Sequence, residues 1–331
     1  MKLLVTGGAG YIGSHVTRQL GEAGHEVVVF DNLSTGHAHA VIGAELVVGD
    51  LADTTLLNAL FERYRFDAVL HFAASIVVPE SVAEPLKYYA NNTRNMLNLL
   101  ECVARFDTRH FVFSSTAAVY GMPDAEQVSE QASLAPINPY GASKAMSERM
   151  LADLARARPL LNYVALRYFN VAGADPAGRI GQETPEATHL IKVACQAALG
   201  LREAVDIFGT DYPTPDGTCI RDYIHVEDLA RAHLDALKYL AEGGESAVLN
   251  CGYGHGASVR EVLAMARTVT GVDFPLRETA RRAGDPARLV AANERIRDML
   301  GWCPRYDDLA TIIAHAWAWE QRLAERASKK I

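Results

Sequence analysis

Short runs of β-branched and other apolar residues alternate with amphipathic stretches through the first half of this 331-residue chain. Runs rich in β-branched and aromatic residues predict strands, whereas apolar residues spaced three or four apart predict helices that pack along one face. The predicted strands are Leu3–Thr6, Glu26–Phe30, Glu45–Val48, Ala68–His71, His110–Ser114 and Tyr163–Arg167, and the helices between them include Thr54–Tyr64 and Pro85–Ala104. This alternation implies right-handed βαβ crossovers, and therefore an α/β fold with a doubly wound parallel sheet.

The pattern loosens after Asn170. Two segments rich in Gly, Pro and acidic residues, 171–186 and 209–217, predict loops. Further helices are predicted at Thr188–Leu199, Val226–Leu240, Ser258–Thr270 and Leu309–Ser328. We therefore expect a first domain at residues 1–170 and a smaller mixed α/β domain at residues 171–331, with segments around 222–250 packing back onto the first.

Composition narrows the class of protein. Hydrophobic residues make up 49% and charged residues 22% of the chain, which is typical of a globular enzyme. The net charge of −8 argues against a nucleic-acid partner, and no apolar run reaches the roughly 18 residues of a membrane span. The chain begins with a strand rather than a signal sequence, so we expect a cytoplasmic protein. The scattered cysteines predict reduced core thiols, with neither disulfides nor a metal site: Cys102, Cys195, Cys219, Cys251 and Cys303.

Three glycines directly after the first strand are the first candidate for a binding function. Gly7, Gly10 and Gly13 have the spacing of a dinucleotide-binding turn that opens a helix. The first would allow a sharp turn, the second a close approach of backbone N–H groups to a pyrophosphate, and the third close packing of helix on strand. Asp31 ends the next strand, where a carboxylate can bind the ribose hydroxyls of NAD and would repel the 2′-phosphate of NADP. The sheet is therefore predicted to be of Rossmann type and to bind NAD.

A second candidate lies at a predicted helix start, which Asn138 and Pro139 mark. Tyr140 and Lys144 would lie one turn apart on the same face of this helix. An ammonium beside a phenol stabilises the phenolate and, helped by a positive nicotinamide ring, would bring the tyrosine pKa toward neutral pH. The strand-end hydroxyl of Thr116 could hydrogen-bond a substrate alcohol together with Tyr140. The simpler interpretation, a surface contact between tyrosine and lysine, loses weight behind a dinucleotide motif.

These segments resemble the extended short-chain dehydrogenase/reductase family and, within it, the UDP-hexose 4-epimerases. The resemblance runs from the first strand to about Trp302 and includes two segments outside the cofactor half, which makes it specific to a subfamily. It implies an isomerase that interconverts UDP-galactose and UDP-glucose through a 4-keto intermediate, with tightly bound NAD as transient hydride acceptor. The matching segments are Thr6 to Gly13, Asp31-Asn32, His71 to Ala74, Pro85 to Asn92, Tyr140-x-x-x-Lys144, Arg167 to Asn170, Phe208 to Thr214 and Asp216 to Val226.

The resemblance also implies roles for individual residues. Tyr140 would be the base in one half-reaction and the acid in the other, and Lys144 would also hold the nicotinamide ribose. The residues that it places against NAD are Gly7, Gly10, Tyr11, Ile12, Gly13, Asp31, Asn32, Asp50, Leu51, Phe72, Ala73, Ala74, Asn91, Ser114, Tyr140, Lys144 and Tyr168. Those that it places against the UDP-sugar are Thr116, Tyr140, Asn170, His189, Leu190, Phe208, Arg221, Tyr223, Arg282, Asp285 and Leu289.

Within the second set, Arg221 and Arg282 would meet the diphosphate of the substrate. Phe208 would pack near the uracil, and Asp285 would accept a hydrogen bond from the uridine ribose. Leu289 stands where the size of the side chain limits the sugar pocket in relatives. It is neither the bulky tyrosine that excludes an N-acetyl group nor a small residue that admits one. N-acetylated UDP-sugars and UDP-glucuronate therefore stay open as substrates.

Two other functions fit parts of the pattern. A nucleotide-sugar dehydratase would share the fold, NAD and the tyrosine–lysine pair, but it needs an acid–base pair where this chain has Ala117 and Ala118. A catalytically silent NAD-sensing regulator would typically lack the tyrosine or the lysine, and both are present. The resemblance further suggests a homodimer that forms through the helices near residues 85–105 and 140–157.

Overall fold

Seven parallel strands form the main sheet of the protein. They are β1 (Lys2–Thr6), β2 (Glu26–Asp31), β3 (Glu45–Val48), β4 (Ala68–His71), β5 (His110–Thr116), β6 (Asn162–Tyr168) and β11 (Ala247–Cys251). They lie in the order β3-β2-β1-β4-β5-β6-β11, and every pairing is parallel. The direction of winding reverses between β1 and β4, which is where doubly wound sheets bind their ligands. The predicted α/β fold of Rossmann type is confirmed.

A computed structural model describes residues 1–184, 187–282 and 284–328. Part of the predicted 171–186 loop, residues 185 and 186, lies outside the described residues, as do residue 283 and residues 329–331. In the described ranges, no helix is both long and apolar enough to cross a membrane.

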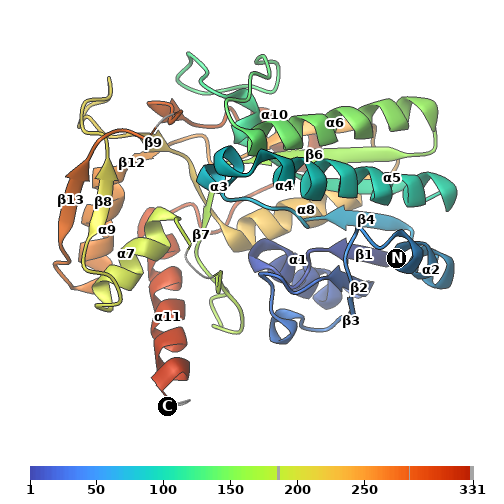
Figure 1. Ribbon diagram of the computed structural model, residues 1–331, viewed down its shortest axis with the longest axis horizontal. Coiled ribbons are helices and arrows are strands. Elements are labelled where there is room, and N and C mark those ends of the chain that lie inside the picture. Colours follow the sequence, from blue (N-terminus) through green and yellow to red (C-terminus); the bar gives the residue numbers. More distant parts are fainter. Residues whose placement is uncertain (185–186, 283, 329–331) are drawn as a thin grey trace.

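Both faces of the main sheet are apolar, and helices cover each of them (Figure 1). In β2, Val27 and Val29 join one buried cluster, whereas Val28 and Phe30 join the other. A strand covered on both faces must be apolar at every position, which explains why these strands are continuous apolar runs in the sequence. The first cluster is covered by α1 (Tyr11–Glu22) and α8 (Val226–Ala241), and the second by α2 (Thr54–Tyr64), α5 (Asn95–Arg105) and α6 (Pro139–Ala157).

Helix α6 begins as the sequence predicts. The side chain of Asn138 accepts a hydrogen bond from the backbone N–H of Gly141 at 2.8 Å, and Pro139 occupies the first turn. A Cβ at Gly141 would lie 2.5 Å from the carbonyl oxygen of Ala118, so the helix start packs closely on the short helix η3 (Ala117–Tyr120). This contact holds the first turns of α6 against the carboxyl end of β5.

A smaller lobe of mixed α/β structure follows the sixth strand (Figure 1). Strand β7 (Asn170–Ala172) pairs with β10 (Tyr223–His225), β8 (Val205–Phe208) with β13 (Leu276–Thr279), and β9 (Ile220–Arg221) lies between β12 (Ala257–Ser258) and β14 (Arg288–Leu289). Its helices are α7 (Leu190–Ala198), α9 (Val259–Thr270) and α11 (Leu309–Ser328), and α10 (Glu294–Leu300) packs on α8. Between these elements the chain returns to the main sheet as α8 and β11. The division into domains at residues 1–170 and 171–331 stays a prediction.

The predicted helix Pro85–Ala104 is interrupted. After α3 (Val78–Ala83), the chain forms α4 (Pro85–Tyr88), a π-helical turn (Tyr89–Arg94) and then α5. Asn91 lies in the widened turn, at the sheet edge where the candidate site is located. Single π turns inside helices are frequent at functional sites, and apolar spacing alone cannot distinguish them from regular helix.

The cysteines also differ from expectation at one position. All five are free, and four are buried as predicted. Cys303 is exposed, so its prediction as a core thiol was wrong. It follows Trp302, which fills the core position of this segment.

Candidate active site

The turn between β1 and α1 has the geometry of a dinucleotide cradle. Gly7 has a φ of +74°, and a Cβ there would lie 2.5 Å from the backbone nitrogen of Ala73. A Cβ at Gly13 would lie 2.2 Å from the carbonyl oxygen of Gly7, so helix and turn touch through this glycine. A Cβ at Gly10 would meet only that same oxygen, at 3.3 Å, which leaves room for a diphosphate to approach the turn. The three glycines therefore fit the three roles that the sequence predicts for them.

Asp31 lies beside this turn, at the end of β2. One carboxylate oxygen accepts from the backbone N–H of Ala9 at 3.0 Å, and the other accepts from the backbone N–H of Leu33 at 2.8 Å. These bonds hold the carboxylate in place and leave lone pairs on both oxygens, which fits a pair of ribose hydroxyls. Asn32 donates to Asp50 at 2.7 Å, which adds a second polar pair at the same sheet edge. Leu51, the next predicted contact, is buried against the α2 side of the core.

Other predicted cofactor residues lie along the same edge. The backbone N–H groups of Phe72 and Ala73 both donate to the carbonyl of Thr6, and the Asn91 amide donates to the Ser75 hydroxyl at 3.0 Å. Ala74 lies between Ala73 and Ser75 in the chain. The side chain of Tyr11, in the first turn of α1, reaches toward the smaller lobe. Its hydroxyl donates to the carbonyl of Gly173 at 2.7 Å and so connects this turn to the segment after β7. Ile12 packs against the core cluster beneath α1.

Tyr140 and Lys144 lie one turn apart on α6, at the carboxyl end of β5. The Lys144 ammonium donates to the carbonyl of Ser114 at 2.7 Å and lies 4.9 Å from the centre of the Phe113 ring. Burial lowers the pKa of Lys144 to about 7, and the Glu148 carboxylate opposes that shift. Burial raises the pKa of Tyr140, and the hydrogen bond with Thr116 opposes that shift.

This direction is opposite to the one that the sequence predicts for Tyr140 with its cofactor. Burial removes the phenolate from water, and the free energy lost in this way exceeds the stabilisation that the neighbouring groups of the protein give to the phenolate. Further positive charge beside the ring, such as that of NAD⁺, would be needed to lower the pKa of the phenol.

Lys144→Met should make the protein more stable while it abolishes activity. Because the pKa of Lys144 is about 7 in the folded protein and near 10.4 when unfolded, the buried ammonium costs folding free energy. The full cost applies below pH 7, and it declines as the pH rises from 7 toward about 10.4. We expect the variant to gain about 5 kcal/mol at pH 6, less the roughly 1 kcal/mol or more that the lost bond to Ser114 contributes. Urea unfolding at pH 6 and pH 10 would test this, and an equal gain at both values would contradict it.

Two hydroxyls at the end of β5 are held by their neighbours. The Thr116 hydroxyl accepts from the backbone N–H of Ala118 at 3.2 Å, which fixes its position beside Tyr140. The Ser114 hydroxyl forms a short hydrogen bond with the Tyr168 hydroxyl. Burial raises the pKa of Tyr168 as it does that of Tyr140, and the Tyr168 hydroxyl differs in being engaged by Ser114.

A carboxylate that the sequence reasoning missed lies one further turn along α6. Glu148 is buried, forms two hydrogen bonds with the guanidinium of Arg167 and accepts a third from Ser115. It is also the charge that favours the ammonium form of Lys144. The spacing in the sequence indicates this residue, because Tyr140, Lys144 and Glu148 are four residues apart and therefore share one face of the helix.

His189 lies at the start of α7, beside a small cavity of about 20 Å³ that Asn170, Leu190 and Tyr223 also line. The amide of Gln182 donates to Nδ1 of His189 at 2.9 Å. An amide nitrogen can only donate, so the proton of the neutral imidazole is on Nε2, which is then a donor for an anion. Burial lowers the pKa of His189 and keeps this ring neutral.

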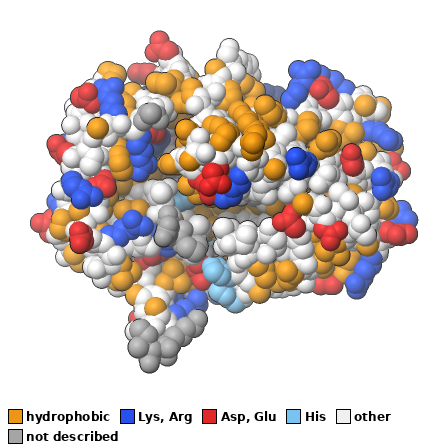
Figure 2. Space-filling view, in the orientation of Figure 1, with side chains coloured by type: hydrophobic (Ala, Val, Ile, Leu, Met, Phe, Trp, Pro, Cys, Tyr) orange, Lys and Arg blue, Asp and Glu red, His pale blue; other side chains and the backbone are white. Residues whose placement is uncertain are grey.

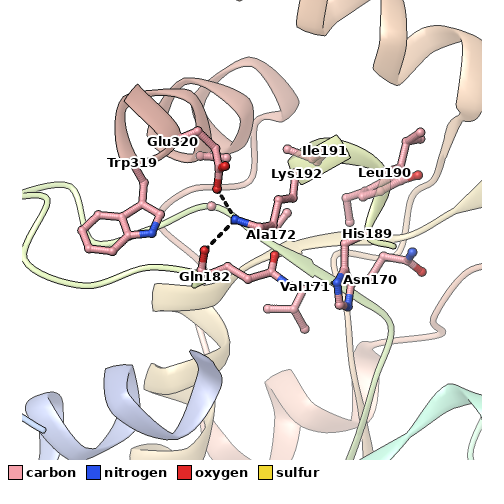
Figure 3. Close-up of a pocket in the computed structure, with 13 residues that line it drawn as sticks. Asn170, Val171, Ala172, Gln182, His189, Leu190, Ile191, Lys192, Trp319 and Glu320 are labelled. Atoms are coloured by element: carbon pink, nitrogen blue, oxygen red, sulfur yellow. Dashed lines mark hydrogen bonds and ion pairs between the residues drawn. The ribbon is translucent and has the colours of Figure 1, made fainter. Parts of the chain in front are cut away.

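The other side of the cavity contains a buried ion pair. The Lys192 ammonium lies between the Glu320 carboxylate and the carbonyl of Gln182 (Figure 3). Since Glu320 belongs to α11, this pair connects the last helix to the segment that carries His189.

The remaining predicted substrate residues form two contacts in the smaller lobe. Arg221 donates to the Asp285 carboxylate at 3.3 Å. The Arg282 guanidinium lies 3.7 Å from the centre of the Phe208 ring. The resemblance implies that the uracil of the substrate packs near this same ring. Arg282 is exposed, so it is free to turn toward a ligand.

Leu289 connects this lobe to the catalytic end of β5. It is paired with Arg221 in the β14–β9 register. Its half-buried side chain packs on the cluster that contains Ala117 and Tyr120, next to Thr116 in the chain. Leu289 therefore links the strand that carries Arg221 to the segment that follows Thr116.

Comparisons with known proteins identify the family of this chain. Residues 3–252 match the model of the NAD dependent epimerase/dehydratase family. The chain is 57% identical to the UDP-glucose 4-epimerase of Azospirillum brasilense, over 98% of this chain and 93% of the relative. It is also similar to the solved UDP-Glc/GlcNAc 4-epimerase of Campylobacter jejuni (TM-score 0.86, 51% identity, 97% of this chain and 99% of that one). A third match is the UDP-glucose 4-epimerase of Bifidobacterium longum in complex with NAD⁺ and UDP (TM-score 0.92, 34% identity, 97% and 98%). The chain therefore belongs to the NAD dependent epimerase/dehydratase family.

Proposed function

We propose that the protein is an isomerase that interconverts UDP-galactose and UDP-glucose, as an enzyme of galactose metabolism. The observation that carries the proposal is the grouping of Tyr140, Lys144 and Thr116 at the carboxyl end of β5, beside a glycine turn that fits a dinucleotide. A base, a cation and a fixed hydroxyl next to a hydride acceptor are what the oxidation and re-reduction of a sugar alcohol require.

When bound, NAD supplies the hydride acceptor and a positive ring that favours phenolate at Tyr140. Tyr140 takes the proton of the sugar 4-hydroxyl while the electron pair of the C4–H bond leaves as hydride. After the 4-keto sugar has turned over in its pocket, the hydride returns to the opposite face and Tyr140 gives the proton back to the oxygen. Lys144 sets the charge beside the phenol, and Thr116 holds the sugar oxygen in line.

The smaller lobe supplies the groups that would bind the UDP part. Arg221 and Arg282 would neutralise the diphosphate, and the Nε2–H of His189 would donate to one of its oxygens. Arg282 would leave the Phe208 ring to do so, and this movement would expose the ring face on which the uracil stacks. Asp285 would exchange its bond with Arg221 for one with the uridine ribose.

The direct test is to incubate the protein with UDP-galactose and follow UDP-glucose by NMR, without added NAD. We expect turnover without net NADH and, in D₂O, no deuterium at carbon 4, because the hydride never exchanges with solvent. Incorporation of deuterium there would contradict the hydride mechanism. Retained NAD binding without any turnover would favour the regulator instead.

N-acetylated UDP-sugars are the second candidate substrates. The observation in favour of them is the intermediate size and partial burial of Leu289 at the predicted sugar pocket. A comparison of kcat/KM for UDP-galactose and UDP-N-acetylgalactosamine would decide between them. Dehydratase activity is disfavoured, because Ala117 and Ala118 supply no acid or base beside Thr116.

Asp31→Asn should weaken NAD binding by about tenfold and narrow the preference for NAD over NADP. The substitution removes the charge that repels a 2′-phosphate. It also turns one hydrogen-bond acceptor toward Ala9 or Leu33 into a donor. Fluorescence titration of both cofactors would measure this, with Asp298→Asn, an exposed position on α10, as a control. An unchanged ratio of the two affinities would remove Asp31 from its role.

We also propose that the protein is a cytoplasmic homodimer that forms through α4, α5 and α6. Leu86 is 79% and Leu97 46% exposed, and Figure 2 shows apolar side chains gathered over this side of the molecule. Leu86→Lys combined with Leu97→Lys should halve the mass measured by light scattering. Val48→Lys, which changes an exposed valine at the opposite edge of the sheet, should leave the dimer intact. A dimer that persists in the double variant would contradict this interface.

A further inference from the structure

Two histidines and a glutamate meet at the surface, outside the site described above. His37 and His39 flank the start of the short helix η1 (Ala38–Ala40), which follows β2, and Glu183 belongs to the segment after β7. Nε2 of His39 lies 3.0 Å from one oxygen of Glu183, and Nε2 of His37 lies 3.9 Å from the other. The ligand atoms of the three residues all lie within 4.8 Å of one another. The imidazole rings stack at 5.3 Å, and both Nε2 atoms approach the same carboxylate.

This spacing fits a borderline metal ion. In a tetrahedral zinc site each ligand is about 2 Å from the metal, so neighbouring ligand atoms are roughly 3.3 Å apart. The His39 distance of 3.0 Å and the His37 distance of 3.9 Å go to the two oxygens of Glu183, and all the ligand atoms lie within 4.8 Å of one another. Small side-chain rotations would bring one oxygen and both nitrogens to the separation of a zinc site. Two imidazoles and one carboxylate are a common zinc ligand set, whereas Mg²⁺ and Ca²⁺ prefer oxygen ligands alone.

The hydrogen bonding of His37 points the same way. Within the described part of the chain, its Nε2 atom has no hydrogen-bond partner, although solvent does not reach it. A buried polar atom without a partner costs free energy, which a bound ion would recover. Glu183 has one competing partner, since Arg326 lies 3.4 Å from the oxygen that His39 contacts. Arg326 is half exposed, and an ion would displace it at little cost.

The position of the cluster gives the ion a structural consequence. The backbone N–H of His37 donates to the carbonyl of Ala9 at 3.0 Å, and Gly36 packs directly on Ala9. Ala9 is part of the glycine turn and bonds Asp31. An ion shared with Glu183 would therefore fasten the segment that packs on the glycine turn to the segment that leads into the smaller lobe. We propose that His37, His39 and Glu183 bind one zinc-class divalent cation, with water as the remaining ligand, and that the ion acts as this clip. The ion would have no part in the hydride chemistry.

Tag-free protein with its bound cofactor, stripped with EDTA and dialysed, can be titrated with Zn²⁺ against a chromophoric chelator. We expect one equivalent to bind, and binding to weaken by at least about tenfold in His37→Ala, in His39→Ala and in Glu183→Gln. His255→Ala is the matched control, because His255 is also exposed and paired with a carboxylate, Asp307, and should bind zinc as the wild type does. Mg²⁺ at the same concentration should not compete.

Two further measurements make the assignment independent of zinc affinity alone. Co²⁺ bound by this ligand set should give the strong visible absorption of a four-coordinate site, and His39→Ala should abolish it. One equivalent of Zn²⁺ should raise the Tm of the wild type and of His255→Ala, and should leave the Tm of His39→Ala unchanged. Circular dichroism would establish that the variants are folded. Stoichiometric binding that survives the combined His37→Ala and His39→Ala substitutions, or no saturable binding in the wild type, would overturn the proposal.

Discussion

Tyr140→Phe should lower the turnover of UDP-galactose by about three orders of magnitude, while the protein keeps its bound NAD. The substitution removes one oxygen and leaves the rest of the half-buried ring unchanged. Because that oxygen carries the proton in both half-reactions, KM should change little and kcat should carry the loss. Steady-state kinetics on purified protein would measure the effect, and the absorbance of released NAD would report the cofactor.

The matched control is Tyr64→Phe. The Tyr64 hydroxyl donates to Glu45 at 2.5 Å, at the far edge of the main sheet, so this variant loses a tyrosine hydroxyl without touching the site. It should retain wild-type turnover. If Tyr140→Phe kept near-normal activity, the base would have to be another group. Lys144, whose pKa is lowered to about 7, would then be the first candidate.

Gly13→Ala should destabilise the folded protein and impair NAD binding together. The new methyl group would lie 2.2 Å from the carbonyl oxygen of Gly7, which is backbone and cannot turn away. Helix α1 would have to move off the turn, at a cost of about 1 to 3 kcal/mol. Chemical unfolding would report the loss of stability. Cofactor retention on gel filtration would report a loss of affinity of at least about tenfold.

Gly10→Ala tests the effect of a methyl group on NAD binding with little effect on the packing of the turn. Its methyl group would meet only the Gly7 oxygen at 3.3 Å, so stability should fall by about 1 kcal/mol or less. NAD affinity should still drop, because the methyl group would occupy space that the diphosphate needs. Equal losses of stability in both variants would contradict this division of roles, as would NAD binding that Gly10→Ala leaves unchanged.

Much of the main sheet follows from local sequence. The predicted helix Thr54–Tyr64 matches the structure at both ends, and the predicted helix Leu309–Ser328 begins where α11 begins. Of the predicted strands, Glu45–Val48 and Ala68–His71 match at both ends, and the others differ by one or two residues at an end. Such segments are predictable because a strand buried on both faces, or a helix buried on one, shows its environment in its own apolar pattern. The π turn at Tyr89–Arg94 leaves no such trace, because one extra residue per turn barely shifts the pattern.

The pKa values of the site were beyond reach of the sequence. The spacing of Tyr140 and Lys144 predicts their contact but not their burial, and burial is what raises the pKa of one and lowers that of the other. The pairing of Glu148 with Arg167 likewise depends on how α6 packs on β6.

The sequence by itself determined the fold class, the glycine turn, the carboxylate at Asp31 and the tyrosine–lysine pair, because each is written in residues close together in the chain. Only the tertiary structure decided which distant residues meet: Glu320 with Lys192, and Glu183 with His37 and His39. Such contacts join segments more than a hundred residues apart, and their partners carry no local pattern. The first contact forms when α7 and α11 pack within the smaller lobe, and the second when the smaller lobe packs beside the segment that follows β2.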